Sequence, residues 1–516
     1  MKPIYLRSAL LAPAVMACLA FSHNALAAKD VTVAVPYGFD SLDPYNTNST
    51  QSQAVGKGWY EGLFMFDRDF KIHPLLATGY EVSEDGLTYT LKLRQNVKFH
   101  DGTDFNADAV KVNFERVLNR SNALGRYNQF KMIDKIEVVD PATVKITLKQ
   151  PFSAFINNLT HPSAMIISPA ALEKYGKDIN LHPTGTGQYT FVEWNPGQNV
   201  KMKKFDGYWD KDHLAKVDSI NFRVVTDNNT RAAVMQTGEA QFTYPIPYEQ
   251  AAVLKKNDKL DLLAEPSIIA RYIAMNNLAK PFDNPKVREA MNYAINKEAL
   301  NKVVFNGYAR VAEGVVPGKV EYSQKMAPWP YDPKKARELL AEAGYPQGFE
   351  TTLWSAYNDG TSVKAIQFIQ QQLRQVGVKV SVEALEAGQR VQRVETVQKP
   401  EDAKVRMYYI GWSASTGEAN WALSPLLASE SWAPTFGNYS YYKNEQVDKD
   451  LADALKTTDK AKKTELYKDA QERIYKDAPW VFLNTADTVA ARSKKLEGFD
   501  MMPDASYYFR DVNLKD

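Results

Sequence analysis

Residues that perform covalent chemistry do not occur in this sequence in the patterns that catalysis requires. The chain has 1 cysteine, Cys18, and neither an H-E-x-x-H nor a G-x-S-x-G pattern. Its S-x-x-K pattern, Ser440 to Lys443, lacks the companion S-D-N and K-T-G patterns. The 6 histidines are scattered without metal-ligand spacing, at positions 23, 73, 100, 161, 182 and 213. We therefore expect binding rather than catalysis, with no catalytic residue, cofactor or metal; an exported hydrolase is the weakest alternative.

The first 27 residues have the pattern of an export signal. Lys2 and Arg7 precede an apolar run from Ala9 to Phe21, and Ala25 to Ala27 form a small-x-small cleavage site. The pattern predicts a signal peptide over residues 1–27 and a mature protein in the periplasm. A lipoprotein cleavage box at Val15 to Cys18 is the minor alternative. No later apolar stretch reaches the roughly 20 residues of a membrane helix.

Net charge gives no support for nucleic-acid binding. The whole chain carries a formal charge of +2, and removing Lys2 and Arg7 with the leader leaves 0. No basic run compensates locally, so we expect no nucleic-acid partner.

The N-terminal part mixes strands and helices. Val31 to Val35 and Thr88 to Arg94 alternate as strands do, and Ile136 to Val139 and Val144 to Leu148 flank a proline turn. Asn106 can cap a helix between them. These elements predict a small mixed domain from about residue 66 to 185.

Helices with defined ends alternate with buried strands in the second half of the sequence. Asn284 and Asp332 each cap a helix that begins with proline, and Gly344 ends the second of these helices. Val378 to Val382 and Arg406 to Ile410 are expected strands. This succession indicates an α/β fold, and the length of 516 residues indicates more than one domain.

Motifs along the whole mature chain resemble the dipeptide, oligopeptide and nickel group of solute-binding proteins of ABC importers. The resemblance rests on Leu75–Val117 with its K-F-x-D-G turn, Gly185–Tyr189, Thr230–Arg231 ahead of Gly238–Glu239, Pro285–Asn296, Tyr331–Gly344 and Gly411–Trp412. It implies a periplasmic-binding-protein type II fold, in which two lobes close a hinged cleft, with a small extra mixed α/β domain.

The resemblance also implies a division of the chain. We expect lobe I to comprise 28–65, 186–268 and 485–516, the small extra domain 66–185, and lobe II 269–484. The hinge crossings are expected near Ser267 to Asn276 and Trp480 to Ala490, where closure would occur.

Three segments are most similar to the glutathione-binding members of this group: FDNPKVREAMNYAIN, YPIPYEQ and GWSASTGEANWALSP. The similarity implies glutathione, or a related small peptide, as the ligand. It implies inner-membrane ABC permease subunits with their ATPase as partners. Other peptides or heme remain alternatives, as does a chaperone or adhesion module.

Two positions depart from the dipeptide-binding pattern. Ser415 stands where dipeptide and oligopeptide receptors have an aspartate for the ligand's ammonium group. Ser355 stands where dipeptide receptors have an arginine for its carboxylate. Each lost charge-assisted contact removes roughly 1.5 to 3 kcal/mol, so we expect ordinary dipeptides to bind poorly.

Glutathione has two carboxylates and one ammonium group, so its receptor needs cations and an acid. The candidate cations are Arg126, Arg390 and Arg271, and the candidate acid is Glu418, beside Ser415 and Thr416. Trp412, Trp354, Tyr45 and Tyr127 are candidate walls. For each arginine, a structural ion pair or a solvated surface position is the open alternative.

Overall fold

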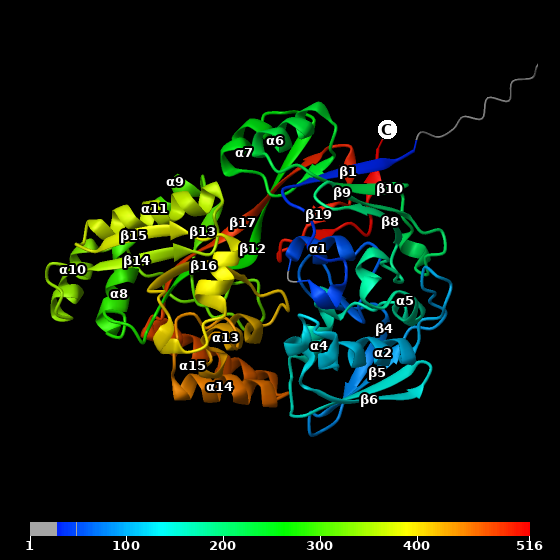
Figure 1. Ribbon diagram of the computed structural model, residues 1–516, viewed down its shortest axis with the longest axis horizontal. Helices are drawn as coiled ribbons and strands as arrows, with labels where there is room; N and C mark the ends of the chain where they lie inside the picture. Colours follow the sequence, from blue (N-terminus) through cyan, green and yellow to red (C-terminus); the bar gives the residue numbers. More distant parts are fainter. Residues whose placement is uncertain (1–27, 48, 516) are drawn as a thin grey trace, which may run out of the picture.

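One mixed sheet of 11 strands crosses the whole molecule (Figure 1). The computed structural model describes residues 28–47 and 49–515, so the predicted leader, 1–27, lies outside the described residues. The sheet order is β15 (Lys379–Ala384), β14 (Glu350–Ser355), β16 (Met407–Ser413), β12 (Leu260–Met275), β17 (Trp480–Ser493), β11 (Phe242–Thr243), β1 (Asp30–Val35), β10 (Ser219–Val224), β9 (Asn199–Lys204) and β8 (Tyr189–Asn195); β13 (Ala309–Val311) pairs with β17.

Two long strands join two parallel strand sets. β1 is parallel to β10 and β11, and β14 is parallel to β15 and β16, whereas β12 and β17 are antiparallel to each other. Parallel neighbours need crossover connections, which helices supply here. The predicted α/β fold class is confirmed. We call residues 28–268 with 485–515 the first half, and residues 269–484 the second half.

A smaller antiparallel sheet forms within the first half. Its order is β4 (Ala77–Val82), β5 (Thr88–Leu93), β7 (Thr143–Leu148) and β6 (Ile133–Asp140), and α2 (Ala107–Leu118) packs on it. Tyr89, Leu91 and Leu93 are buried on one face of β5, as their alternation predicts. The Asn106 side chain accepts a hydrogen bond from the Ala109 amide at 3.1 Å, which confirms the predicted cap.

The remaining longer helices surround the two halves (Figure 1). The first half has α1 (Thr50–Gly56), α4 (Phe155–Thr160), α5 (Pro169–Tyr175), α6 (Asn228–Thr237) and α7 (Tyr248–Leu254). The second half has α8 (Pro285–Ala294), α9 (Lys297–Val304), α10 (Pro333–Glu342), α11 (Gly360–Arg374), α13 (Ala419–Leu427), α14 (Glu445–Lys456) and α15 (Lys460–Asp477). Asn284 and Asp332 cap α8 and α10, and Gly344 has a φ of 90° just after α10, as predicted.

Two hydrophobic cores cover the two faces of the second half's sheet. On β16, Met407 and Tyr409 enter the core formed with α8, α9, α10 and α11, whereas Tyr408 enters the core formed with α13, α14 and α15. This alternation follows from the two-residue period of a strand. The small sheet instead shares a continuous core with the rest of the first half.

The predicted boundaries at 268/269 and 484/485 fall inside β12 and β17, and the division into lobes stays a prediction. β12 is irregular there, with register shifts between Pro266 and Ala270 and between Arg271 and Tyr272. Among the described residues, no helix combines the length and apolarity needed to cross a bilayer.

Candidate ligand site

A cavity of about 350 Å³ lies between residues 77–148, which we call the small-sheet region, and the second half. One side is lined by Gly125, Arg126, Asn128 and Gln129, and the other by Trp412, Trp421, Thr435 and Phe436. Ligand pockets commonly have volumes of roughly 300 to 1,000 Å³ and lie at domain interfaces. The fold thus brings together two predicted site residues, Arg126 and Trp412, from distant parts of the chain. We call this the Arg126 cavity.

Arg126 is positioned by backbone oxygens of the loop before α1. Its Nε donates to the Thr47 carbonyl at 2.9 Å, and its amide donates to the Tyr45 carbonyl at 3.2 Å. Burial lowers the pKa of Arg126 to about 10, and nearby Asp40 only partly opposes this. Among the described residues, no carboxylate lies within 4.0 Å of its guanidinium nitrogens. The cation is therefore available to an anionic ligand.

Three aromatic rings form the opposite wall. The Trp412 indole Nε1 donates to the Trp421 carbonyl at 2.7 Å, which fixes its ring at the end of β16. Ring centroids lie 5.8 Å apart for Trp412 and Trp421 and 5.9 Å apart for Trp421 and Phe436. Such rings provide large apolar contact area at low cost in conformational entropy.

The predicted cation Arg271 lies in a separate cavity at the junction of the halves. This cavity is lined by residues that include Tyr37, Tyr244, Tyr248, Asp359 and Tyr409. Arg271 lies 4.6 Å above the Tyr357 ring, and its buried Nη1 has no hydrogen-bond partner among the described residues. Burial opposes its charge, but the surrounding tyrosines and Asp359 raise its pKa overall.

Gly411 makes room for Arg271. A Cβ at residue 411 would lie 2.8 Å from the Arg271 Nη1 and 2.9 Å from its Cδ. The glycine of the Gly411–Trp412 motif therefore lets the arginine side chain cross β16.

Glu418, the predicted acid, is already engaged within the protein. Its Oε2 accepts a hydrogen bond from the Asn420 amide at 2.8 Å and caps α13. Its Oε1 lies 2.8 Å from the Lys463 ammonium nitrogen, with the two side chains only 1% and 6% exposed. The carboxylate thus forms a buried structural ion pair. Across residues 28–47 and 49–515, no three His, Cys, Asp or Glu side chains gather as metal ligands would.

The chain matches the model of a known protein family. The family model of the bacterial extracellular solute-binding proteins, family 5, middle region, matches residues 71–434. The chain belongs to this family.

Relatives of this solute-binding protein match it over nearly their whole length. The glutathione-binding protein GsiB of Pectobacterium atrosepticum is 62% identical over 488 residues, covering 95% of each chain. The protein of the same name from Salmonella typhimurium is 62% identical, covering 95% of this chain and 96% of the relative.

Solved structures of the family share the fold. The periplasmic binding protein DppA of Helicobacter pylori, in complex with the peptide STSA, is 29% identical with a TM-score of 0.81, covering 94% of this chain and 98% of that one. A dipeptide-binding protein of Pseudoalteromonas in complex with Met-Leu is 26% identical with a TM-score of 0.82, covering 94% and 100%. The predicted periplasmic-binding-protein type II fold is thereby confirmed.

Several predicted site residues of this solute-binding protein have partners of their own. Arg390 forms an ion pair with Glu395, with 2.8 Å between Nε and Oε1. Trp354 is 7% exposed and covered by the Arg393 guanidinium, 4.1 Å from its ring centre. The Ser355 hydroxyl donates to the Tyr357 carbonyl at 2.7 Å and accepts from the Tyr357 amide.

The other predicted residues do not line the Arg126 cavity. Tyr45 is fully buried, 6.0 Å from the Phe130 ring, and Tyr127 lies under the Arg120 guanidinium. Ser415 is half-buried, and the buried Thr416 accepts a hydrogen bond from Asn157 at its carbonyl.

The sequence reasoning did not identify Gln129, Trp421 or Phe436, which also line the cavity. Gln129 is 4% exposed, its Oε1 accepts from the Ser163 hydroxyl at 2.8 Å, and its Nε2 has no partner among the described residues. Gln129 follows Arg126 by three residues, and Arg126 directly precedes α3 (Tyr127–Phe130). Residues three apart on a helix lie on the same face, so this spacing is the sequence signal for Gln129 as a site residue.

Proposed function

We propose that this protein is the glutathione-binding receptor of an ABC importer. The observation that carries the proposal is 62% identity, over 95% of both chains, to a relative named glutathione-binding protein. Its role is binding and delivery, without chemical conversion of the ligand.

The Arg126 cavity supplies groups suited to such a ligand. The unpaired guanidinium of Arg126 is matched to a carboxylate, and the free Nε2 of Gln129 is matched to a carbonyl or carboxylate oxygen. Trp412, Trp421 and Phe436 contact the intervening atoms. A ligand here touches both the small-sheet region and the second half, so binding favours the closed arrangement.

The two positions that replace the dipeptide anchors both carry neutral side chains. Ser355 is fully buried and its hydroxyl is taken by the Tyr357 backbone, and Ser415 is a half-buried neutral side chain. An ordinary dipeptide therefore has no charged partner at either position and is disfavoured as a ligand.

Delivery follows from closure about β12 and β17. The two strands cross between the halves, and the irregular stretch of β12 from Pro266 to Tyr272 absorbs the change in backbone angles. We propose that the closed form is recognised by inner-membrane permease subunits with their ATPase. The predicted leader places the mature protein in the periplasm.

Titration calorimetry on the leaderless protein tests the proposal. Reduced glutathione is expected to bind with a dissociation constant on the order of micromolar, which corresponds to about −8 kcal/mol, and Ala-Ala is expected to give negligible heat. Glutathione recovered from the complex should be chemically unchanged. Equal affinity for the two ligands would refute glutathione specificity, and tighter binding of heme would redirect the assignment.

A further inference from the structure

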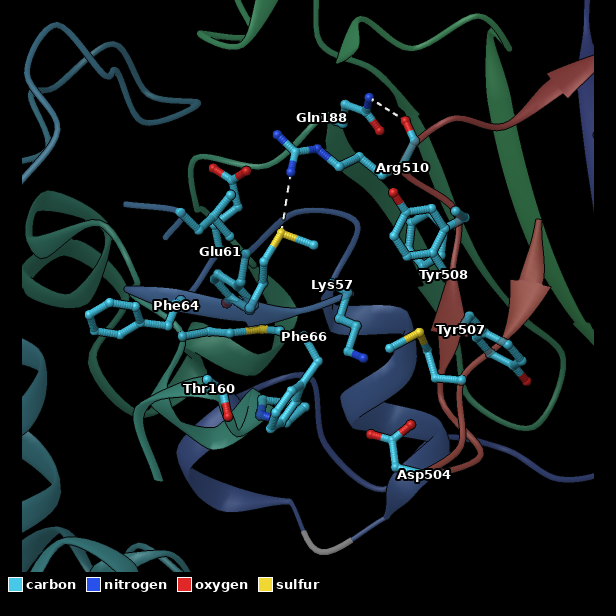
Figure 2. A pocket seen from close by; sticks show the side chains of 18 of the residues that line it. Lys57, Glu61, Phe64, Phe66, Thr160, Gln188, Asp504, Tyr507, Tyr508 and Arg510 are labelled. Carbon is cyan, nitrogen blue, oxygen red and sulfur yellow. Dashed lines mark hydrogen bonds between the residues drawn. The ribbon is translucent and has the colours of Figure 1, made fainter. Parts of the chain in front are cut away.

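A third cavity, of about 110 Å³, lies within the first half (Figure 2). Its apolar lining includes Phe64, Met65, Phe66, Met165, Met502 and Phe509. Lys57, at the end of α1, and Asp504 lie towards one end, while Glu61, Gln188 and Arg510 lie towards the other. We call it the Lys57 cavity.

The charged groups at the far end have partners within the protein, although the buried Arg510 Nε has no hydrogen-bond partner among the described residues. Glu61 accepts hydrogen bonds from Tyr208, Trp209 and Thr186, at 2.7, 2.8 and 2.8 Å. Arg510 forms an ion pair with Asp210. This end therefore stabilises the fold and has little charge left for a ligand.

Lys57 and Asp504 retain unused hydrogen-bonding capacity. The Lys57 Nζ donates to the Ser506 hydroxyl at 2.6 Å, which leaves two of its N–H groups without a partner among the described residues. The Asp504 Oδ1 accepts from the Ser506 amide and hydroxyl at 3.0 and 2.6 Å, and no described residue donates to Oδ2. Burial lowers the pKa of Lys57, and the negative charge of Asp504 opposes that shift. A cation and an anion with unused hydrogen-bonding capacity thus lie on either side of one serine.

His161 lies between the lining of the Lys57 cavity and the lining of the Arg126 cavity. Thr160 and Pro162, the neighbours of His161, line the Lys57 cavity, and the His161 ring lies 6.3 Å from Trp421 of the Arg126 cavity. Burial and the positive charges of Arg126 and Lys57 hold the pKa of His161 well below its usual value. Both cations therefore lie near the same buried ring.

The chemistry of a γ-linked peptide matches this pair. In an ordinary peptide the free ammonium and carboxylate groups are at opposite ends of the molecule. In a γ-glutamyl peptide one α-carbon carries both groups, because the peptide bond uses the side-chain carboxyl. Adjacent positive and negative side chains complement that arrangement.

We propose that Lys57 and Asp504 bind the α-carboxylate and α-ammonium of a γ-glutamyl group, while Arg126 binds the carboxylate at the ligand's other end. The inference rests on the proposed glutathione function and adds the feature that selects the γ-linkage. The methionine and aromatic side chains beside the pair contact the ligand's aliphatic chain.

The test compares glutathione with its α-linked isomer, α-Glu-Cys-Gly, by calorimetry on the leaderless chain. Wild type should bind glutathione at least about tenfold more tightly than the isomer. Lys57→Met and Asp504→Asn should each weaken glutathione binding by roughly 10- to 100-fold and bring the ratio of the two affinities close to one. Lys57→Arg, which keeps the charge, should retain most of the preference.

Exposed Lys494 and Asp258 provide matched controls, and Lys494→Met and Asp258→Asn should keep both the affinity and the ratio. Circular dichroism melting identifies variants that do not fold, in which case Lys57→Gln and Asp504→Ser replace them. An unchanged ratio in folded Lys57 and Asp504 variants overturns the inference and leaves the proposed function intact. A wild-type protein that does not bind glutathione overturns the function itself.

Discussion

The arginines near the junction of the two halves fall into two groups. Arg390 and Arg393 each contact a carboxylate, Glu395 at 2.8 Å and Glu383 at 2.5 Å. Arg126 and Arg271 have no carboxylate within 4.0 Å among the described residues, although both are placed by the fold at a cavity. A buried charge without a partner is costly. An anionic group of a ligand therefore stabilises the arginines that have no carboxylate more than it stabilises the paired arginines. The presence or absence of a protein counter-charge therefore separates binding candidates from structural residues.

The largest expected effect concerns the buried pair of Glu418 and Lys463. Glu418→Gln leaves the Lys463 ammonium buried without a counter-charge, so we expect a loss of about 3 to 5 kcal/mol in the free energy of unfolding. Urea denaturation measures this loss. The preference for glutathione over Ala-Ala should survive in the folded fraction. Unchanged stability together with lost glutathione binding would assign Glu418 to the ligand instead.

The same comparison of paired and unpaired side chains applies to two histidines, and it predicts how stability depends on pH. His213 is paired with Asp511 at 2.6 Å, whereas among the described residues the ring nitrogens of His100 hydrogen-bond only to the backbone of Gly185 and Gly187. Burial lowers the pKa of His100 from 6.5 to about 4. The unfolded chain takes up a proton on His100 at higher pH than the folded chain does. The contribution of neutral His100 to the free energy of unfolding is therefore complete above pH 6.5. It is lost as the pH falls towards 4, by about 3 kcal/mol.

Urea unfolding at pH 7 and pH 4 measures this term in wild type and in His100→Gln. The decrease on acidification should be smaller in the variant by about that amount. Identical decreases in both proteins would show that folding does not lower the pKa of His100.

Removing an unpaired cation should affect binding more than folding. We expect Arg126→Met to weaken glutathione binding by roughly 10- to 150-fold, since one charge-assisted contact contributes about 1.5 to 3 kcal/mol. Calorimetry gives the affinity, and thermal melting should show only a small change. A large loss of stability with unchanged affinity would place Arg126 among the structural arginines.

A neutral contact across the cleft should have a smaller effect. The Asn157 Nδ2 donates to the Thr416 carbonyl at 3.0 Å, joining α4 to the second half. Asn157→Ala should weaken glutathione binding by about 2- to 10-fold, because one neutral hydrogen bond contributes about 0.5 to 1.5 kcal/mol. Stopped-flow kinetics should show faster ligand dissociation with little change in association. An effect confined to association would contradict a closing contact.

The smallest effect is expected for the paired Arg390. Its side chain and that of Glu395 are 32% and 30% exposed, and such pairs contribute about 0 to 1 kcal/mol. Arg390→Met should change glutathione affinity by less than about fivefold, as measured by calorimetry. A loss as large as that of Arg126→Met would show that ion pairing within the protein does not exclude a ligand role.

Local patterns in the sequence were sufficient for much of the fold. The caps at Asn106, Asn284 and Asp332 are all present, because capping depends on a side chain and an amide only two or three residues away. The strands predicted around residues 88–94 and 378–382 follow from the same short-range periodicity. Motifs spread along the whole chain also indicated the family.

What the sequence could not determine is which charges meet. Arg126 and Arg390 are the same residue type, yet of the two only Arg390 has a carboxylate within 4.0 Å among the described residues, and Glu418 is neutralised by Lys463 from α15. Lys57 and Asp504 come from opposite ends of the chain and meet only across the folded first half. Electrostatic interaction depends on distance in space and on burial, and both are set by tertiary packing rather than by sequence spacing. The sequence by itself therefore determined the elements and the family, and only the tertiary structure decided which charged residues are free to bind a ligand.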